Sequence, residues 1–133
     1  MDDHLTIHFD GSCTKNPGGI ARYGFEIRDS KNNIVHTNSA IICSGSGASN
    51  NTAEYGGLTA ALRYLKSQDW MGTLSIYGDS KLVISQLNGA WKCNKPHLRN
   101  YLIECQTLLK GWNWTAEWVP RGQNENADLL SRS

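Results

Sequence analysis

Four acidic residues, Asp10, Glu54, Asp79 and Asp128, are the side chains of this sequence best placed to do chemistry together. Carboxylates crowded at one place raise one another's pKa, so such a cluster is stable near neutral pH only when cations neutralise it. Oxygen ligands that share the coordination shell with water suit Mg²⁺ or Mn²⁺ better than Zn²⁺. Two such ions can clamp a phosphodiester between an attacking water and a leaving oxygen, so the chemistry indicated is phosphoryl transfer.

Each acid taken alone also has an ordinary structural explanation. Asp10 precedes Gly11, a pair that is typical of a turn after a strand. Glu54 fits a salt bridge to an Arg or Lys, or an exposed first-turn position that the helix dipole favours. Because acids recur at strand ends and on helix faces, a common site is favoured. Whether the acids meet depends on the strands and helices that carry them.

Alternation of apolar and polar residues predicts the strand that carries Asp10. Residues 5–9 alternate with period two, and the pattern breaks at Gly11 and again at residues 16–19 (NPGG). A second strand is predicted around residues 23–27 and a third over residues 34–42, with a polar turn between them. Connections this short favour three antiparallel neighbours.

Glu54 and Asp79 fall in a strand, helix, strand succession. A helix is predicted over residues 50–66, where an Asn-Asn-Thr start supplies good capping residues and Glu54 shares the apolar face. A short strand over residues 73–78 then ends at Asp79. Because such a crossover makes its flanking strands parallel, we expect this strand beside the first, with Asp10 and Asp79 as neighbours.

The remaining segments complete one α/β domain, predicted over residues 1–133. A helix follows Asp79, a longer one begins at Pro96, and a last strand with alternating tryptophans leads to a short helix over residues 124–131 that bears Asp128. Trp114 and Trp118 of that strand are expected in the core. Trp70 and Trp112 flank other elements and are expected to cover edges of the fold.

Composition bounds the class of protein. The 133 residues include 13 Lys and Arg against 12 Asp and Glu, so any basic surface for nucleic acid must be local. No apolar run approaches the roughly 20 residues of a membrane span, and nothing demands more than a monomer. Without a CxxC pair or an apolar signal segment, reduced thiols in a cytoplasmic protein are expected. The cysteines are Cys13, Cys43, Cys93 and Cys105.

Four segments, in order along the chain, resemble the motifs of type 1 ribonuclease H. They are residues 10–19 (DGSCTKNPGG), 50–54 (NNTAE), 77–80 (YGDS) and 119–131 (VPRGQNENADLLS). The resemblance covers nearly the whole chain and includes all four acids. It implies the ribonuclease H-like α/β fold, a five-stranded mixed sheet whose first three strands are antiparallel and the rest parallel to the first, with helices on both faces.

The resemblance also implies an endonuclease that hydrolyses the RNA strand of RNA/DNA hybrids and leaves 5′-phosphate and 3′-hydroxyl ends. By position in the motifs, Asp10 would bridge two Mg²⁺ ions, for which Mn²⁺ is a substitute. Glu54 and Asp79 would hold the ion on the leaving-group side. Asp128 would hold the ion that carries the nucleophilic water.

Positions in the same motifs imply contacts to the hybrid. The implied substrate contacts are Ser12, Cys13, Asn16, Ser49, Asn50 and Asn51. Short polar groups of this kind can sense a 2′-hydroxyl, and Ser49 takes the place of a phosphate-binding threonine. Asn16 is also an ordinary turn residue, and Asn50 and Asn51 are ordinary helix caps, so both roles stay open for them.

The chain departs from the family pattern in two places. Residues 89–95 are too short for the basic protrusion of many members, although a local basic strip remains for the phosphates of the DNA strand, with a solvated surface as the alternative. The loop before Asp128 holds no histidine, and Arg121 is expected to contact the scissile phosphate there by charge. The strip consists of Lys81, Trp91, Lys92 and Lys95.

Two other functions compete with a hybrid-specific ribonuclease. One is another ribonuclease H-like nuclease, such as an integrase or a proofreading exonuclease, and Asn16, Asn50 and Asn51 argue against it. The other is a catalytically silent module that binds hybrid or double-stranded RNA. The retention of all four acids argues against the silent module, because a pure binder gains nothing from an anionic cluster that faces phosphates.

Overall fold

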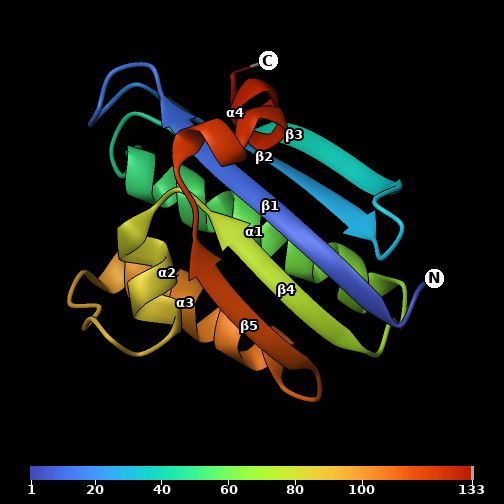
Figure 1. Ribbon diagram of the computed structural model, residues 1–133. Helices are drawn as coiled ribbons and strands as arrows, with labels where there is room; N and C mark the ends of the chain where they lie inside the picture. Colours follow the sequence, from blue (N-terminus) through green and yellow to red (C-terminus); the bar gives the residue numbers. More distant parts are fainter. Residues whose placement is uncertain (133) are drawn as a thin grey trace.

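One five-stranded sheet runs through the computed structural model, which describes residues 1–132 (Figure 1). The strands are β1 (His4–Cys13), β2 (Ile20–Asp29), β3 (Ile34–Ser44), β4 (Thr73–Gly78) and β5 (Asn113–Trp118). They lie in the order β3-β2-β1-β4-β5. The first three are antiparallel neighbours, whereas β4 is parallel to β1 and β5 is parallel to β4. The predicted ribonuclease H-like fold class is therefore confirmed.

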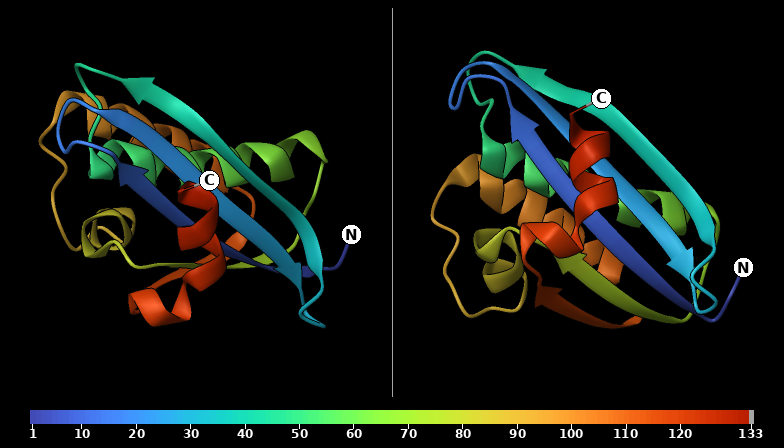
Figure 2. Two further views of the ribbon diagram at one scale, coloured as in Figure 1. Left: turned by 90° about the horizontal axis from the view of Figure 1, so that it is seen from above. Right: turned by 45° about the horizontal axis from the view of Figure 1, so that its top comes forward.

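Helices cover both faces of this sheet (Figure 2). The helices are α1 (Asn50–Ser67), α2 (Lys81–Leu87), α3 (Pro96–Leu109) and α4 (Glu125–Ser131), with one 3-10 turn, η1 (Arg121–Gln123). On one face α1 crosses the sheet and α3 packs on α1, whereas α4 lies across β1 and β2 on the other face. Gly24 of β2 allows α4 to come this close, because a Cβ there would lie 2.5 Å from Leu130 Cβ.

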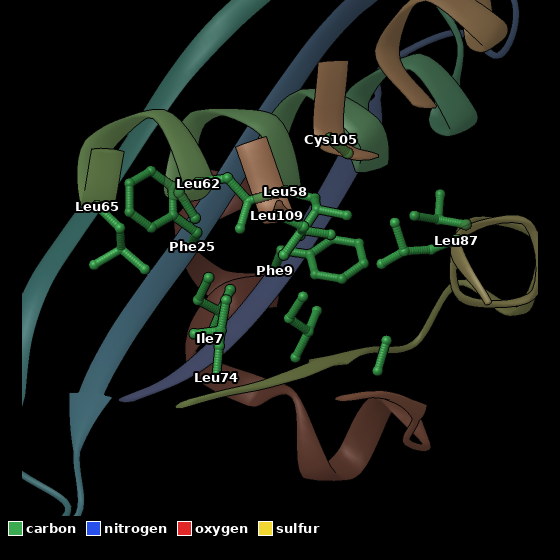
Figure 3. Packing of buried hydrophobic residues seen from close by; sticks show 14 of the residues in the cluster. Ile7, Phe9, Phe25, Leu58, Leu62, Leu65, Leu74, Leu87, Cys105 and Leu109 are labelled. Atoms are coloured by element: carbon green, nitrogen blue, oxygen red, sulfur yellow. The ribbon is translucent and has the colours of Figure 1, made fainter. Parts of the chain in front are cut away.

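The hydrophobic core fills the space between α1 and the sheet (Figure 3). Leu5, Ile7 and Phe9 alternate along β1 and are fully buried, because successive side chains of a strand point to opposite faces. They pack with Leu58 and Leu62 from the apolar face of α1. Burying one such side chain contributes about 1.5–3 kcal/mol, so this packing fixes α1 against β1 and sets the position of the residues that follow Phe9.

The tryptophans are placed differently from the sequence-based expectation. Trp70 and Trp112 are buried in the core, with ring centroids 5.3 Å apart in an edge-on contact, and the Trp112 Nε1–H donates to the Trp70 carbonyl. Trp114 is only partly buried, and Trp118 is 42% exposed. The prediction of a buried Trp118 is therefore wrong, because alternation identifies the face of an edge strand but not whether a helix covers its end.

The cysteines are free thiols, as predicted. Cys105 lies in the core, and burial raises the pKa of its thiol to about 11, so it stays protonated and unreactive near neutral pH. Within residues 1–132, no helix combines the length and the apolar character that crossing a membrane requires.

Candidate active site

Three of the four predicted acids meet at one edge of the sheet. Asp10 continues β1 directly after Phe9, which pairs with Gly78 at the end of β4, so Asp79 emerges beside it. Glu54 reaches the same point from the first turns of α1. One ligand oxygen from each carboxylate lies within 4.8 Å of those of the other two, and Asp10 is only 3% exposed. The structure thus brings together Asp10, Glu54 and Asp79 as the strand order predicts.

Two glycines let α1 approach the end of β1. A Cβ at Gly11 would lie 2.3 Å from the backbone nitrogen of Glu54, and a Cβ at Gly57 would lie 3.0 Å from the Asp10 carbonyl oxygen. Gly11 is therefore required by the close passage of the helix. The expected strand break at Gly11 is wrong, because β1 continues to Cys13 and pairs with β2 from Leu5 to Cys13.

Burial and mutual repulsion shift the carboxylates toward their protonated forms. Burial raises the pKa of Asp10 to about 7, and the neighbouring carboxyl groups of Asp128 and Asp79 act in the same direction. Burial, with the charge of Asp10 next in size, raises the pKa of Glu54 well above its usual range. Groups that must be ionised at neutral pH in this setting need cations beside them.

The donor set fits a divalent cation. No Arg or Lys within residues 1–132 forms an ion pair with Glu54, so the salt-bridge alternative for this acid is not realised. The buried Oε2 of Glu54 and Oδ2 of Asp79 have no hydrogen-bond partner there, and the nearest cation to Asp79 is the Arg121 Nε at 3.9 Å. Unpaired carboxylate oxygens in one buried cluster are the ligands that Mg²⁺ and Mn²⁺ prefer.

Asp128 lies beside this trio rather than within it. Its Oδ1 accepts a hydrogen bond of 3.2 Å from the Nε of Arg132, the C-cap residue of α4. The position of α4 is fixed by Asn124, whose buried amide donates to the Phe9 carbonyl at 2.8 Å, and by Ser131, whose carbonyl accepts from the Ser12 hydroxyl. The sequence analysis did not select Asn124. Its position just before a short helix is the only sequence feature that indicates a structural role for it.

A pocket of about 430 Å³ opens beside the acids and contains four predicted substrate contacts. Glu54 and Asp128 both line it. Two arginines that the sequence analysis did not select, Arg22 and Arg132, also line it. The predicted contacts in this pocket are Ser12, Cys13, Asn50 and Arg121.

A second pocket of about 400 Å³ lies at the start of α1 and gathers the other predicted contacts. Ser49 is the N-cap of the helix, and its hydroxyl accepts from the Thr52 N–H, so the capping role expected for Asn50 and Asn51 belongs to Ser49. Asn16 holds the loop against the helix, because its side-chain oxygen accepts from the Asn50 N–H at 3.1 Å. The predicted contacts that line this pocket are Asn16, Ser49, Asn51 and Lys95.

The residues of the predicted basic strip lie in three places. Lys95 borders the second pocket, whereas the Lys81 ammonium lies 4.7 Å from the ring centroid of Trp118. Trp91 and Lys92 are exposed in the loop that follows α2. The binding of DNA phosphates by these residues stays a prediction.

Comparisons with known proteins agree with this fold. The model of a family described as reverse transcriptase-like matches residues 8–133. Ribonuclease HI of Halobacterium salinarum is 38% identical over 125 residues, which are 93% of this chain and 60% of the relative. Bifunctional protein Rv2228c of Mycobacterium tuberculosis is 34% identical over 130 residues, 96% of this chain and 34% of the relative. The chain thus spans less than two thirds of the length of these curated relatives.

Solved ribonuclease H structures have the same fold, and this chain covers most of the length of each. The N-terminal RNase H domain of rv2228c from Mycobacterium tuberculosis superposes with a TM-score of 0.90 at 32% identity, covering 98% of this chain and 92% of that one. RNase H1 from Halobacterium salinarum gives a TM-score of 0.86 at 37% identity, with 96% and 93% covered. LC11-RNase H1, solved in complex with an RNA/DNA hybrid, gives 0.86 at 30% identity, with 95% and 92% covered.

The mixed sheet and the acidic cluster at its edge define a ribonuclease H-like protein. The chain belongs to the reverse transcriptase-like family and, within the ribonuclease H-like superfamily, to the type 1 ribonuclease H family.

Proposed function

We propose that residues 1–133 form a single catalytic domain that hydrolyses the RNA strand of RNA/DNA hybrids and leaves 5′-phosphate and 3′-hydroxyl ends. The observation that carries the proposal is the trio of Asp10, Glu54 and Asp79, whose ligand oxygens lie within 4.8 Å of one another. Two of the carboxylate oxygens are buried and have no hydrogen-bond partner among residues 1–132. The names of the relatives, and the hybrid bound to LC11-RNase H1, support the choice of substrate.

In this proposal the four acids would bind two metal ions, each with its own set of ligands. Asp10 would be shared by two Mg²⁺ ions, Glu54 and Asp79 would hold the ion on the leaving-group side, and Asp128 would hold the other. Bound Mg²⁺ supplies a water of lowered pKa and positive charge for the leaving oxygen, and Mn²⁺ has the same oxygen preference. No protein nucleophile is needed.

Polar groups around the acids bind and orient the hybrid in this proposal. Arg121, close to Asp79 and otherwise exposed, is placed to bind the scissile phosphate. Ser12, Cys13 and Asn50 line the same pocket and face the cleaved strand. The second pocket, with Asn16 and Lys95, takes a phosphate of the DNA strand across the minor groove. We infer that the enzyme acts as a monomer in the cytoplasm, where its free thiols stay reduced.

The test is cleavage of a hybrid labelled on its RNA strand, with Mg²⁺, with Mn²⁺ and with a chelator. Single-stranded RNA, duplex RNA and duplex DNA serve as competing substrates. Metal-dependent internal cuts confined to the hybrid RNA are expected. Asp10→Asn should abolish them, whereas Asp69→Asn, which makes the same change at an exposed position, should not. A folded protein that binds Mg²⁺ but leaves the hybrid intact would favour a silent binding module.

A further inference from the structure

Arg22 lies on β2 opposite Ser12 of β1, whose hydroxyl donates to the carbonyl of Ser131 at the end of α4. Side chains two residues apart on a strand share a face, and Gly24 faces α4 closely enough for a Cβ to meet Leu130 and Ser131. Arg22 therefore points to the α4 side of the sheet, where it lines the same pocket as Asp128. Figure 1 shows α4 crossing β1 and β2 at this end of the sheet.

Within residues 1–132, Arg22 differs from the other arginines of this pocket in having no carboxylate partner. Arg121 lies 3.9 Å from an Asp79 oxygen, and Arg132 lies 3.2 Å from an Asp128 oxygen. Arg22 makes no hydrogen bond or ion pair with any residue of the described chain, and its Nε–H is buried without an acceptor. A buried donor left unpaired is unfavourable, so the side chain fits a ligand that brings its own acceptor.

The acceptor best matched to this position is a phosphate. A guanidinium binds a phosphate through two parallel N–H groups, and it offsets the repulsion between incoming phosphates and the carboxylates nearby. The pocket that Arg22 lines also contains Glu54 and Asp128, so a phosphate reaching Arg22 belongs to the strand that crosses the acids. The DNA strand is expected instead at the second pocket, beside Asn16.

We propose that Arg22 binds a phosphate of the cleaved RNA strand next to the scissile one and so anchors that strand over the acidic cluster. This inference rests on the proposed function, because it assumes that an RNA/DNA hybrid is the substrate. It adds a substrate-binding residue on β2, outside the four motif segments from which the other contacts were predicted.

A purely structural role for Arg22 would be to sit near the C-terminal end of α4, where carbonyl groups favour a cation. The two roles differ in what they change. Loss of a phosphate contact weakens hybrid binding and lowers its dependence on salt, whereas loss of a helix-end contact lowers the melting temperature. Thermal unfolding of each variant is therefore measured beside binding.

Binding is measured with the Asp10→Asn protein and a short RNA/DNA hybrid in chelator, over a series of salt concentrations, so that cleavage does not interfere. Arg22→Gln should weaken binding several-fold at low salt and reduce the slope of log K against log salt by about 0.9, the value for one phosphate contact. Arg22→Lys should restore most of the slope. Lys31→Gln, which removes one charge from the turn between β2 and β3, should leave the slope unchanged.

A second series of hybrids carries one neutral methylphosphonate in place of one RNA phosphate. A methylphosphonate at one position near the cut should weaken hybrid binding by the parent. It should not weaken binding by Arg22→Gln, because that variant has already lost the phosphate contact. Equal slopes for Arg22→Gln and its parent, or a methylphosphonate profile unaltered by the substitution, would overturn the proposal, and so would hybrid binding too weak to measure in the parent. Cleavage by the protein with Asp10 intact is scored separately, so a failure of the proposed ribonuclease activity is distinguished from a failure of the Arg22 contact.

Discussion

The backbones of Gly11 and Glu54 are in such close contact that a Cβ at Gly11 would lie 2.3 Å from the Glu54 nitrogen. This contact, between the central strand and the first long helix, sets the distance between Asp10 and Glu54. The spacing of the candidate metal ligands is thus determined by a residue that carries no side chain.

Gly11→Ala should therefore move α1 away from β1 and separate the two carboxylates. We expect weaker Mg²⁺ binding, cleavage at least tenfold slower, and a loss of about 1–3 kcal/mol in the free energy of unfolding, as for overpacked core sites. Gly122→Ala is the matched control, because a Cβ at Gly122 meets no atom of the described chain within 4 Å. Calorimetric Mg²⁺ titration and denaturant unfolding measure the two effects, and an Mg²⁺ affinity unchanged by Gly11→Ala would contradict the expectation.

Asp10→Asn should stabilise the metal-free protein while it removes activity. Burial raises the pKa of Asp10 to about 7 in the folded state, above its unfolded value of 3.8, so its protonated form favours folding and that contribution is lost as pH rises through about 7. Asparagine stays neutral, so the variant should gain up to about 4 kcal/mol over the parent above pH 7 and little below pH 4. Unfolding in chelator across this pH range tests the sign, and a variant less stable than the parent at about pH 8 would contradict it.

Arg121→Ala should slow turnover and leave metal binding nearly unchanged. The Arg121 side chain is 72% exposed, and its Nε is 3.9 Å from Asp79, too far for a hydrogen bond that would support the acidic cluster. A loss of one phosphate contact in the transition state predicts a decrease in rate of about tenfold. Single-turnover and multiple-turnover rates test this prediction. If variant and parent cleave at equal rates in both experiments, a role for Arg121 in turnover is ruled out.

Asn124→Ala should affect α4 and Asp128 more than the rest of the fold. The side-chain amide of Asn124 donates a buried hydrogen bond to the Phe9 carbonyl. Removing this donor leaves the carbonyl without that hydrogen bond, which should lower the free energy of unfolding by about 1–3 kcal/mol. We expect slower cleavage together with a lower melting temperature. Asn113→Ala, at an exposed asparagine, serves as the control. Normal activity in Asn124→Ala would show that Asp128 is positioned by other contacts.

The fold and three of the acids could be predicted because the information about them is local. Alternation identified the strands, the strand, helix, strand succession made β4 parallel to β1, and these two facts made Asp10 and Asp79 neighbours. Glu54 followed from its place on the apolar face of α1. Each inference needed only short-range patterns and one rule of chain connection.

The parts that the sequence did not predict depend on contacts between distant segments. The close approach of α1 explains Gly11 better than a turn does, and no local pattern reports such an approach. The exposure of Trp118 depends on whether a helix covers the end of β5. Arg22 and Asn124 are ordinary residues for a strand and a helix start, and their significance appears only when β1, β2 and α4 are brought together.

The candidate acids differ in the stability of the elements that carry them. Asp10 and Glu54 are on the central strand and the longest helix, whose amide hydrogens should exchange with solvent only during global unfolding. Asp128 is on a helix of 7 residues, of which only Ala127 and Ser131 are buried, so its amides should exchange through local opening. A metal ion held through Asp128 should accordingly have a shorter residence time than one held by the trio, and the site should fill and empty in two kinetic phases.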